Sequence, residues 1–372
     1  MEMMSKPNWE EPPFIPGLDL CEAYYWEAVR PIILRHLSTL PHSAALIGYG
    51  SDVIGCDTPM SRDHMWGPRM VLFLPPCDFE INRMIINNAL RQELPLTFRG
   101  YPTHFGPPDQ EGVRLLTPIE SGPVEHLIEI QTIEAYFERE LGIDPYIEPE
   151  VTDWLTFQEH RLLSLTAGRV FHDDLELEAV RARFSYYPRD IWLYLLASQW
   201  MLISQEEPFM GRTGQNGDEI GSRVITARLV ERIMRLCFLM EKQYAPYSKW
   251  FGTLFQRLKC ARKMTPLLAG ALNGQDWQER EQFLSQAYVL LIRMHNALDI
   301  TPPMKEETSL FHGRPFQVSH GERFSEAIRA AIQDREVRAL PPSIGSVNQF
   351  MVESSDALQS VSITRKARAL YK

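Results

Sequence analysis

The sequence predicts an α+β protein with a mixed α/β domain on the N-terminal side and an all-helical domain after it. Two patterns carry this prediction. Short apolar runs that suit buried strands, such as residues 44–47 and 70–74, alternate with turns and amphipathic segments up to about residue 149. From about residue 150, apolar residues recur at helical spacing almost without a break. The 372 residues are enough to build a core in each of two domains.

We expect four consecutive parts. They are an extended arm (1–18), the α/β domain (19–149), the helical domain (150–340) and a surface tail (341–372). The arm contains four prolines, which block helix formation. The tail is predicted to lie on the surface because it is rich in Pro, Ser and Gly near its start.

Composition narrows the class of protein. The formal net charge is −10 and the pI is about 5.6, which disfavours bulk nucleic acid as a partner because duplex binding needs a basic face. The five cysteines are odd in number and include no C-x-x-C pair, which argues against a disulfide framework or a zinc site and for a reducing compartment. The first 16 residues have no apolar signal-peptide core, and the longest apolar stretch, 191–203, is too short to span a bilayer. We therefore expect a cytoplasmic protein.

The elements of the first domain follow from local patterns. An apolar stripe predicts a helix over 19–40, with a kink or a late start at Pro31. After the two strands, apolar residues at 81, 84, 85, 89 and 90 predict a helix over 80–93. Many Pro and Gly residues in 94–124 predict short strands and loops that form a flap over the site. A strand is expected at 127–131 and a helix at 133–141, ended by Gly142.

The second domain is predicted to consist of helices packed on one another. Their expected ranges are 154–170, 174–184, 189–206, 220–243, 248–260, 276–298 and 322–338.

The turn Gly50-Ser51 suggests a phosphate site. Backbone amides can approach a phosphate closely where one residue lacks a side chain. Asp63 stands just ahead of the 70–74 strand, and Glu129 points to the solvent side of the 127–131 strand. If these strands are neighbours, the two carboxylates could hold divalent metal for a triphosphate. Each residue also has a purely structural interpretation. Gly50-Ser51 could be an ordinary turn at the end of a strand, Asp63 a capping or turn aspartate, and Glu129 an exposed position of the sheet.

These residues carry a resemblance. Gly50-Ser51 followed after eleven residues by Asp63, with a third carboxylate on a later strand, resembles the signature of the nucleotidyltransferase superfamily. More closely, the chain resembles an uncharacterised family, a domain of unknown function, that is assigned to this superfamily. The runs that carry this closer resemblance are 50–52, Asp57, Ser61, 63–64, 66–69, 172–175, 187–190, 217–219, 245–252 and 294–296. The resemblance implies a nucleotidyltransferase-like domain followed by a helical domain, as in the kanamycin nucleotidyltransferase-like proteins.

The resemblance also implies an activity and a site. A nucleoside monophosphate would move from a nucleoside triphosphate, most simply ATP, to a small-molecule or protein acceptor with Mg²⁺, releasing pyrophosphate. A tRNA end remains an allowed acceptor. Gly50 and Ser51 would hold phosphate, while Asp63, Glu129 and Asp52 would hold metal, the first two as catalytic residues.

The helical domain adds four further candidates. Tyr247, Ser248 and Lys249 would meet the nucleotide, because related nucleotidyltransferases supply Tyr, Ser and Lys from this domain. The alternative is a plain helix start after Pro246. Asp218 would be a general base for the acceptor hydroxyl; its structural alternative is the N-cap of the 220–243 helix.

One position departs from the superfamily pattern. Met65 stands where a second acidic residue is expected, and a thioether is a poor ligand for hard cations. Asp52 or Asp57 could substitute for it. The alternative function is a catalytically inactive nucleotide-binding or protein-interaction module. A third possible function is that of an α/β enzyme of another chemistry.

The run 172–174 (His-Asp-Asp) has metal-ligand residue types, but it also suits a helix N-cap.

Overall fold

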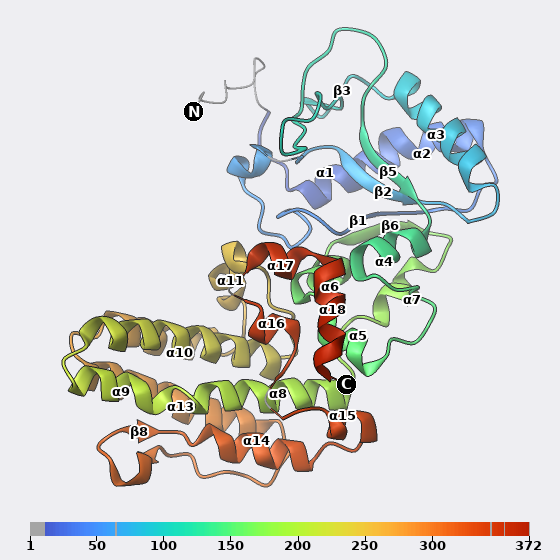
Figure 1. Ribbon diagram of the computed structural model, residues 1–372. Coiled ribbons are helices and arrows are strands. Elements are labelled where there is room, and N and C mark those ends of the chain that lie inside the picture. The colour runs from blue at the N-terminus through green and yellow to red at the C-terminus, as the bar shows by residue number, and fades with distance from the viewer. Residues whose placement is uncertain (1–11, 64, 343, 353, 372) are drawn as a thin grey trace. The chain divides into compact units, whose positions relative to one another are not determined.

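The computed structural model describes residues 12–63, 65–342, 344–352 and 354–371, and for Asp63 it describes the backbone alone (Figure 1). The described chain forms two compact units. Unit 1 comprises the residues up to Glu148 together with Arg161–Ser185, and unit 2 comprises Pro149–His160 together with the residues from Tyr186 on. This division differs from a single boundary near residue 150, because the chain returns to unit 1 to add a strand.

Unit 1 is built on a four-stranded sheet. Its strands are β1 (Ser43–Leu46), β2 (Arg69–Phe73), β5 (Leu127–Gln131) and β6 (Arg169–Asp173), in the order β5–β2–β1–β6. β1 is antiparallel to β2 and β6, and β2 is parallel to β5. The first three strands were predicted to within one residue. β6 was not predicted. Its first two residues were wrongly assigned to the end of the 154–170 helix, and its last three were placed between that helix and the next one, because the strand directly follows a long amphipathic pattern.

The remaining elements of unit 1 are mostly helical. They are α1 (Gly17–Tyr24), the π-helix η1 (Tyr25–Val29), α2 (Arg30–His36), the 3₁₀ helix η2 (Pro59–Asp63), α3 (Phe79–Glu93), β3 (Thr97–Phe98), β4 (Tyr101–Pro102), α4 (Ile133–Leu141), α6 (Glu159–Thr166) and α7 (Leu177–Ala182). The first two residues of α6 belong to unit 2. The predicted helices at 80–93 and 133–141 are confirmed, and Gly142 ends α4 in the left-handed conformation. Short strands and loops occupy 94–124, as predicted.

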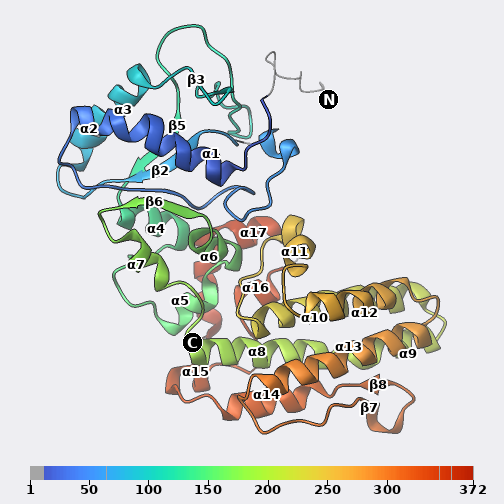
Figure 2. The ribbon, with the colours of Figure 1, turned by 180° about the vertical axis from the view of Figure 1, so that it is seen from behind.

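The core of unit 1 lies between the sheet and the helices α1, α2 and α3, which follow one another on the same side of it (Figures 1 and 2). Leu46, Leu72 and Ile128 project from the sheet into this core. α4 covers the other face, where the Tyr136 ring meets Phe73 edge-on at 5.3 Å between centroids. Burial on both faces explains why β1 and β2 read as continuous apolar runs.

Part of the predicted apolar pattern faces solvent. Ile81 and Met84 on α3 are 62% and 60% exposed, because the helix turns Ile86, Ala89 and Leu90 to the core instead. Predicted burial was therefore wrong for the first turns of this helix.

Unit 2 is helical, as predicted. Its elements are α5 (Val151–Thr156), α8 (Arg189–Ser204), α9 (Glu207–Gln215), α10 (Glu219–Met240), α11 (Ser248–Phe255), α12 (Ala261–Asn273), α13 (Trp277–Ala297), β7 (Ser309–Leu310), η3 (Phe311–Gly313), β8 (Gln317–Val318), α14 (Gly321–Ala330), α15 (Arg335–Ala339), α16 (Val347–Phe350), α17 (Ser355–Gln359), α18 (Val361–Lys366) and η4 (Ala367–Tyr371). The centre of its core is the stacked pair Trp200 and Phe324, which joins α8 to α14. No helix among the described residues is long and apolar enough to cross a membrane.

The described residues of the predicted tail, 341–372, do not form a segment that lies on the surface alone. Val347 and Thr364 are fully buried, and the Tyr371 hydroxyl donates a hydrogen bond to the carbonyl of Gly345 at 2.8 Å. Gln158 donates to the Thr364 hydroxyl at 2.8 Å, which ties this segment to the chain that follows α5. Pro, Ser and Gly predicted a loop, but here they separate short buried helices.

Candidate functional site

The predicted metal ligand Asp52 forms a buried ion pair. Its carboxylate is 1% exposed and accepts hydrogen bonds from Arg69 Nη2 at 2.7 and 2.9 Å and from the Val53 amide at 3.0 Å. Burial raises the pKa of Asp52, and the Arg69 guanidinium opposes that shift. The oxygens that a metal ion would need are therefore occupied by the protein itself.

The Gly-Ser turn is shaped by the same ion pair. Gly50 has a φ of +131°, and a Cβ there would collide with Asp52 and Arg69. Internal packing therefore requires glycine at position 50, so this residue is not by itself evidence of a phosphate site at Ser51. Asp57, the other carboxylate considered as a replacement ligand, accepts hydrogen bonds from the Gly17 amide at 2.7 Å and from Trp66 Nε1 at 3.0 Å. Both bonds are accepted by Oδ2, so this carboxylate fixes the start of α1.

Glu129 lies on β5 as predicted, but the residue beside it on the neighbouring strand is not a second carboxylate. The residue opposite it on β2 is Val71, and the Glu129 carboxylate pairs with Arg139 and Gln131. Asp63 ends η2, six residues before β2, so it lies off the strand; its side chain and His64 lie outside the described residues. The described members of the predicted metal set do not fit a Mg²⁺ ion.

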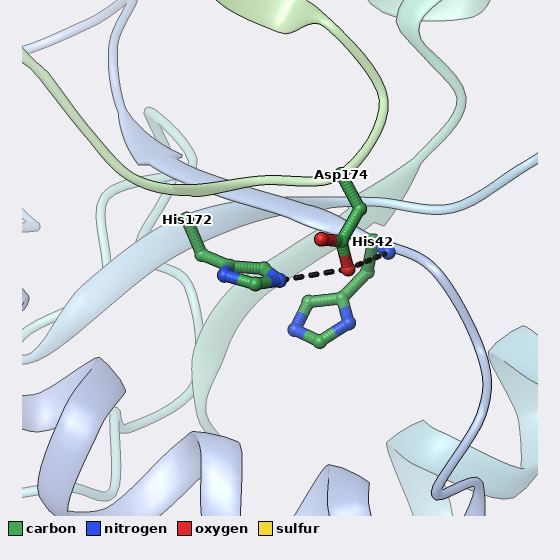
Figure 3. Close-up of side chains that lie close together, drawn as sticks. All are labelled: His42, His172 and Asp174. Atoms are coloured by element: carbon green, nitrogen blue, oxygen red, sulfur yellow. Dashed lines mark hydrogen bonds and ion pairs between the residues drawn. The ribbon is translucent and has the colours of Figure 1, made fainter.

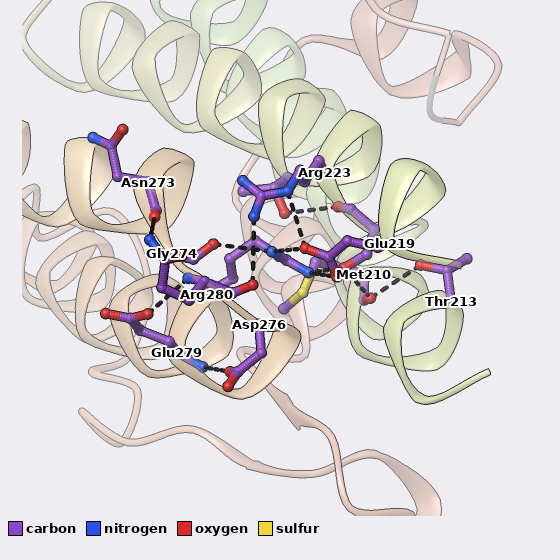
Figure 4. Close-up of polar contacts among 12 residues, drawn as sticks. Met210, Thr213, Glu219, Arg223, Asn273, Gly274, Asp276, Glu279 and Arg280 are labelled. Carbon is purple, nitrogen blue, oxygen red and sulfur yellow. Dashed lines mark hydrogen bonds and ion pairs between the residues drawn. The ribbon is translucent and has the colours of Figure 1, made fainter. Parts of the chain in front are cut away.

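Asp218 caps α10. Its Oδ1 accepts a hydrogen bond from the Gly221 amide at 2.8 Å, which is the structural alternative to the general-base prediction. The next residue, Glu219, pairs with Arg280, whose side chain is fully buried on α13 (Figure 4). Arg280 also donates to the carbonyl of Gly274 at 3.1 Å and to the Ser222 hydroxyl at 2.9 Å. The run 217–219 therefore holds helices together.

Arg280→Met is expected to lower the free energy of unfolding by about 2–3 kcal/mol, because the protein loses the charged hydrogen bonds of a buried guanidinium. The loss is limited because water can still hydrate the Glu219 carboxylate, which is 45% exposed. Urea unfolding followed by circular dichroism measures this change. The matched control is Arg293→Met on the same helix, since Arg293 is 60% exposed and its pair with Glu306 is at the surface. Equal effects of the two substitutions would contradict the assignment.

A cavity of about 320 Å³ lies within unit 2. Its walls come from the start of α6, the middle of α10, the loop that precedes α11, and α16 and α17. The lining residues are Glu159, His160, Glu231, Arg235, Ala245, Pro246, Tyr247, Ser248, Phe251, Asn348, Val352, Ser355, Leu358 and Gln359. Cavities of this size with a few polar groups are common small-molecule sites.

Glu159 is the chemically distinctive group of this cavity. Burial raises the pKa of its carboxyl to about 7, although the Arg235 guanidinium and the Ala245 amide oppose the shift. The carboxyl influences three neighbouring tyrosines, Tyr186, Tyr187 and Tyr244, whose pKa values burial raises well above the usual range. A carboxyl that is half protonated near neutral pH can both donate and accept a proton.

Asn348 fixes the position of Glu159. Its side-chain oxygen accepts a hydrogen bond from the Glu159 amide at 2.8 Å, and its nitrogen donates to the carbonyl of Phe157 at 2.8 Å. The residue is 5% exposed, so these bonds are shielded from water. The segment predicted to be a surface tail thus supplies the residue that orients the start of α6.

Arg235 supplies the positive charge of the cavity. Its Nε and Nη2 donate to one oxygen of Glu231 at 3.0 and 2.9 Å, and its guanidinium lies 5.0 Å from the centroid of the Phe251 ring. Nη1 has no hydrogen-bond partner within the described part of the chain. Arg235 can therefore donate to a ligand without giving up its pair with Glu231.

Two of the three predicted nucleotide-contacting residues line this cavity. Tyr247, which is 42% exposed, precedes α11, and Ser248 is its first residue. Lys249 is exposed and lies with its ammonium 5.2 Å from the Trp250 ring centroid, outside the cavity lining. Sequence reasoning missed Glu159, Arg235 and Asn348, since an acid at a helix start, an arginine on a long helix and an asparagine in a polar tail are ordinary.

Comparison with known proteins gives one result in the same region. Residues 154–251 match the model of a family described as a domain of unknown function (DUF4037). The matched segment contains Glu159, Arg235, Tyr247 and Ser248 of the cavity. No curated protein and no solved structure matches the chain.

Proposed function

We propose that the protein binds a nucleotide in the cavity of unit 2, without the metal-dependent transfer that the sequence resemblance implies. One observation carries the proposal: a buried carboxyl of near-neutral pKa, a guanidinium with an unused donor and the start of α11 converge on one cavity. These features support the nucleotide-binding alternative, which we prefer to a nucleotidyltransferase that moves a nucleoside monophosphate.

Several groups suit a phosphate. Arg235 Nη1, the Ser248 hydroxyl and the first amides of α11 are donors, and helix N-termini favour anions. The base would pack on Tyr247, which is exposed at the rim. Glu159 would bind such a ligand in its protonated form, because an ionised carboxylate beside a phosphate is repulsive. Binding should therefore be tighter at pH 6 than at pH 8.

Transfer with Mg²⁺ and ATP is the second candidate. It is supported by the succession of α2, β1, β2, α3 and β5 in unit 1, with Gly50-Ser51 in the turn that follows β1 and Glu129 on β5. Against it stand Met65 and the protein partners of Asp52, Asp57 and Glu129. The contacts of these residues therefore do not suit a Mg²⁺ ion.

The test is calorimetric titration of the four nucleoside triphosphates and inorganic phosphate at pH 6 and 8. Arg235→Gln is expected to weaken nucleotide binding about tenfold or more, the loss of one charged hydrogen bond. Arg228→Gln is the matched control, since Arg228 lies on the same helix, pairs with Glu206 and does not line the cavity. Failure of every nucleotide to bind, or equal losses in both variants, would refute the proposal.

A further inference from the structure

A second group of functional side chains lies in unit 1, away from the predicted triphosphate residues. His42 directly precedes β1, and His172 and Asp174 lie at the end of β6 (Figure 3). One ligand atom from each residue lies within 4.8 Å of the other two. The closest pair is His172 Nε2 and Asp174 Oδ2, 2.8 Å apart.

The three side chains are held by partners that leave metal-binding atoms facing one another. His42 is 2% exposed, and its Nδ1 is 3.2 Å from the carbonyl of Leu40, so an Nδ1–H donated there leaves Nε2 as the electron-pair donor. Metal-bound histidines are commonly oriented in this way. Asp174 Oδ2 also accepts a hydrogen bond from the backbone amide of His42 at 3.3 Å, which holds the carboxylate beside this residue.

Two backbone irregularities place these groups together. The π-helix η1 begins at Tyr25, whose hydroxyl is 2.8 Å from His42 Nε2 and whose ring stacks on His172. The pairing of β1 with β6 shifts register beside Ala44, the partner of His172. π-helical turns and β-bulges are uncommon, and both recur at functional sites.

We propose that His42, His172 and Asp174 bind a divalent transition-metal ion of the zinc type. Two imidazoles and one carboxylate are the ligand types that zinc accepts in open sites, with a fourth position for water. Mg²⁺ and Ca²⁺ prefer oxygen ligands and do not suit this set. Tyr25 would give up its hydrogen bond to His42 and lie next to the fourth position. The ion would tie β6 to β1, and the site is independent of the nucleotide cavity in unit 2.

The test is titration of metal-free protein with Co²⁺, read by visible absorption, and with Zn²⁺, read by calorimetry. We expect one equivalent to bind, and His172→Ala and Asp174→Asn to weaken binding by about tenfold or more. Both side chains are partly exposed, so these variants should fold, as a thermal melt will verify. His36→Ala is the matched control, because His36 forms a surface pair with Glu93 and should leave the affinity unchanged. Absence of stoichiometric binding, or unchanged binding in both site variants, would overturn the proposal.

Discussion

Replacing Arg69 by methionine is expected to lower the free energy of unfolding of unit 1 by about 3–5 kcal/mol, because it leaves the carboxylate of Asp52 buried without its partner. Asp52 is 1% exposed and Arg69 13%, so water cannot replace the lost guanidinium. The double variant Asp52→Asn/Arg69→Met should recover part of the loss, since no unpaired charge then remains. Urea unfolding of the three proteins measures both effects.

The control for this prediction is Arg83→Met on α3. Arg83 forms an exposed pair with Glu80, so its loss should change stability little. If Arg69→Met is as mild as this control, Asp52 does not depend on Arg69. Its carboxylate would then be available to a metal ion, as the sequence resemblance implies.

The second large effect is the gain of stability expected when the Glu159 carboxyl is replaced by an amide. Its carboxyl has an ordinary pKa of 4.5 when unfolded and about 7 when folded. Below about pH 4.5 both states are protonated and the difference vanishes. Between pH 4.5 and 7 the unfolded carboxyl ionises while the folded one stays protonated, so the wild type loses stability, by about 3 kcal/mol once the pH exceeds 7.

Glu159→Gln should remove this loss. The variant is expected to be more stable than the wild type by about 3 kcal/mol at pH 8 and to differ little at pH 4.5. Unfolding curves recorded across this range test the prediction. Glu326→Gln, at an exposed position of α14, is the matched control. A constant offset between Glu159→Gln and the wild type would contradict the raised pKa.

The sequence predicted the sheet of unit 1 well wherever a strand stood alone between turns. β1, β2 and β5 are short apolar runs with clear boundaries, and both faces of the sheet are covered. β6 was not predictable in this way, because Val170 and Phe171 also continue the helical spacing of α6. Its place beside β1 depends on contacts between residues more than a hundred positions apart.

The candidate site shows the same limit. Tyr247 and Ser248 were found from a local run, and both line the cavity. Asn348 lies 189 residues from Glu159, and no local pattern relates them. The acidity of Glu159 is a consequence of burial, which a sequence position does not reveal. In unit 1 the reverse holds. Gly50 matches the superfamily signature and Asp52 and Asp57 were candidate replacements for an acid at position 65, but packing against the Asp52–Arg69 pair explains Gly50, and internal partners explain the contacts of the two aspartates.

The most direct test of the central claim is calorimetric titration of one nucleotide, ATP, in EDTA and again in Mg²⁺, on the wild type and on Asp63→Ala. Binding in the unit 2 cavity predicts similar affinity in all four titrations and no pyrophosphate release. Binding that requires Mg²⁺, is lost in Asp63→Ala and is accompanied by pyrophosphate release with an acceptor would contradict it. That result would establish metal-dependent nucleotidyl transfer in unit 1 instead.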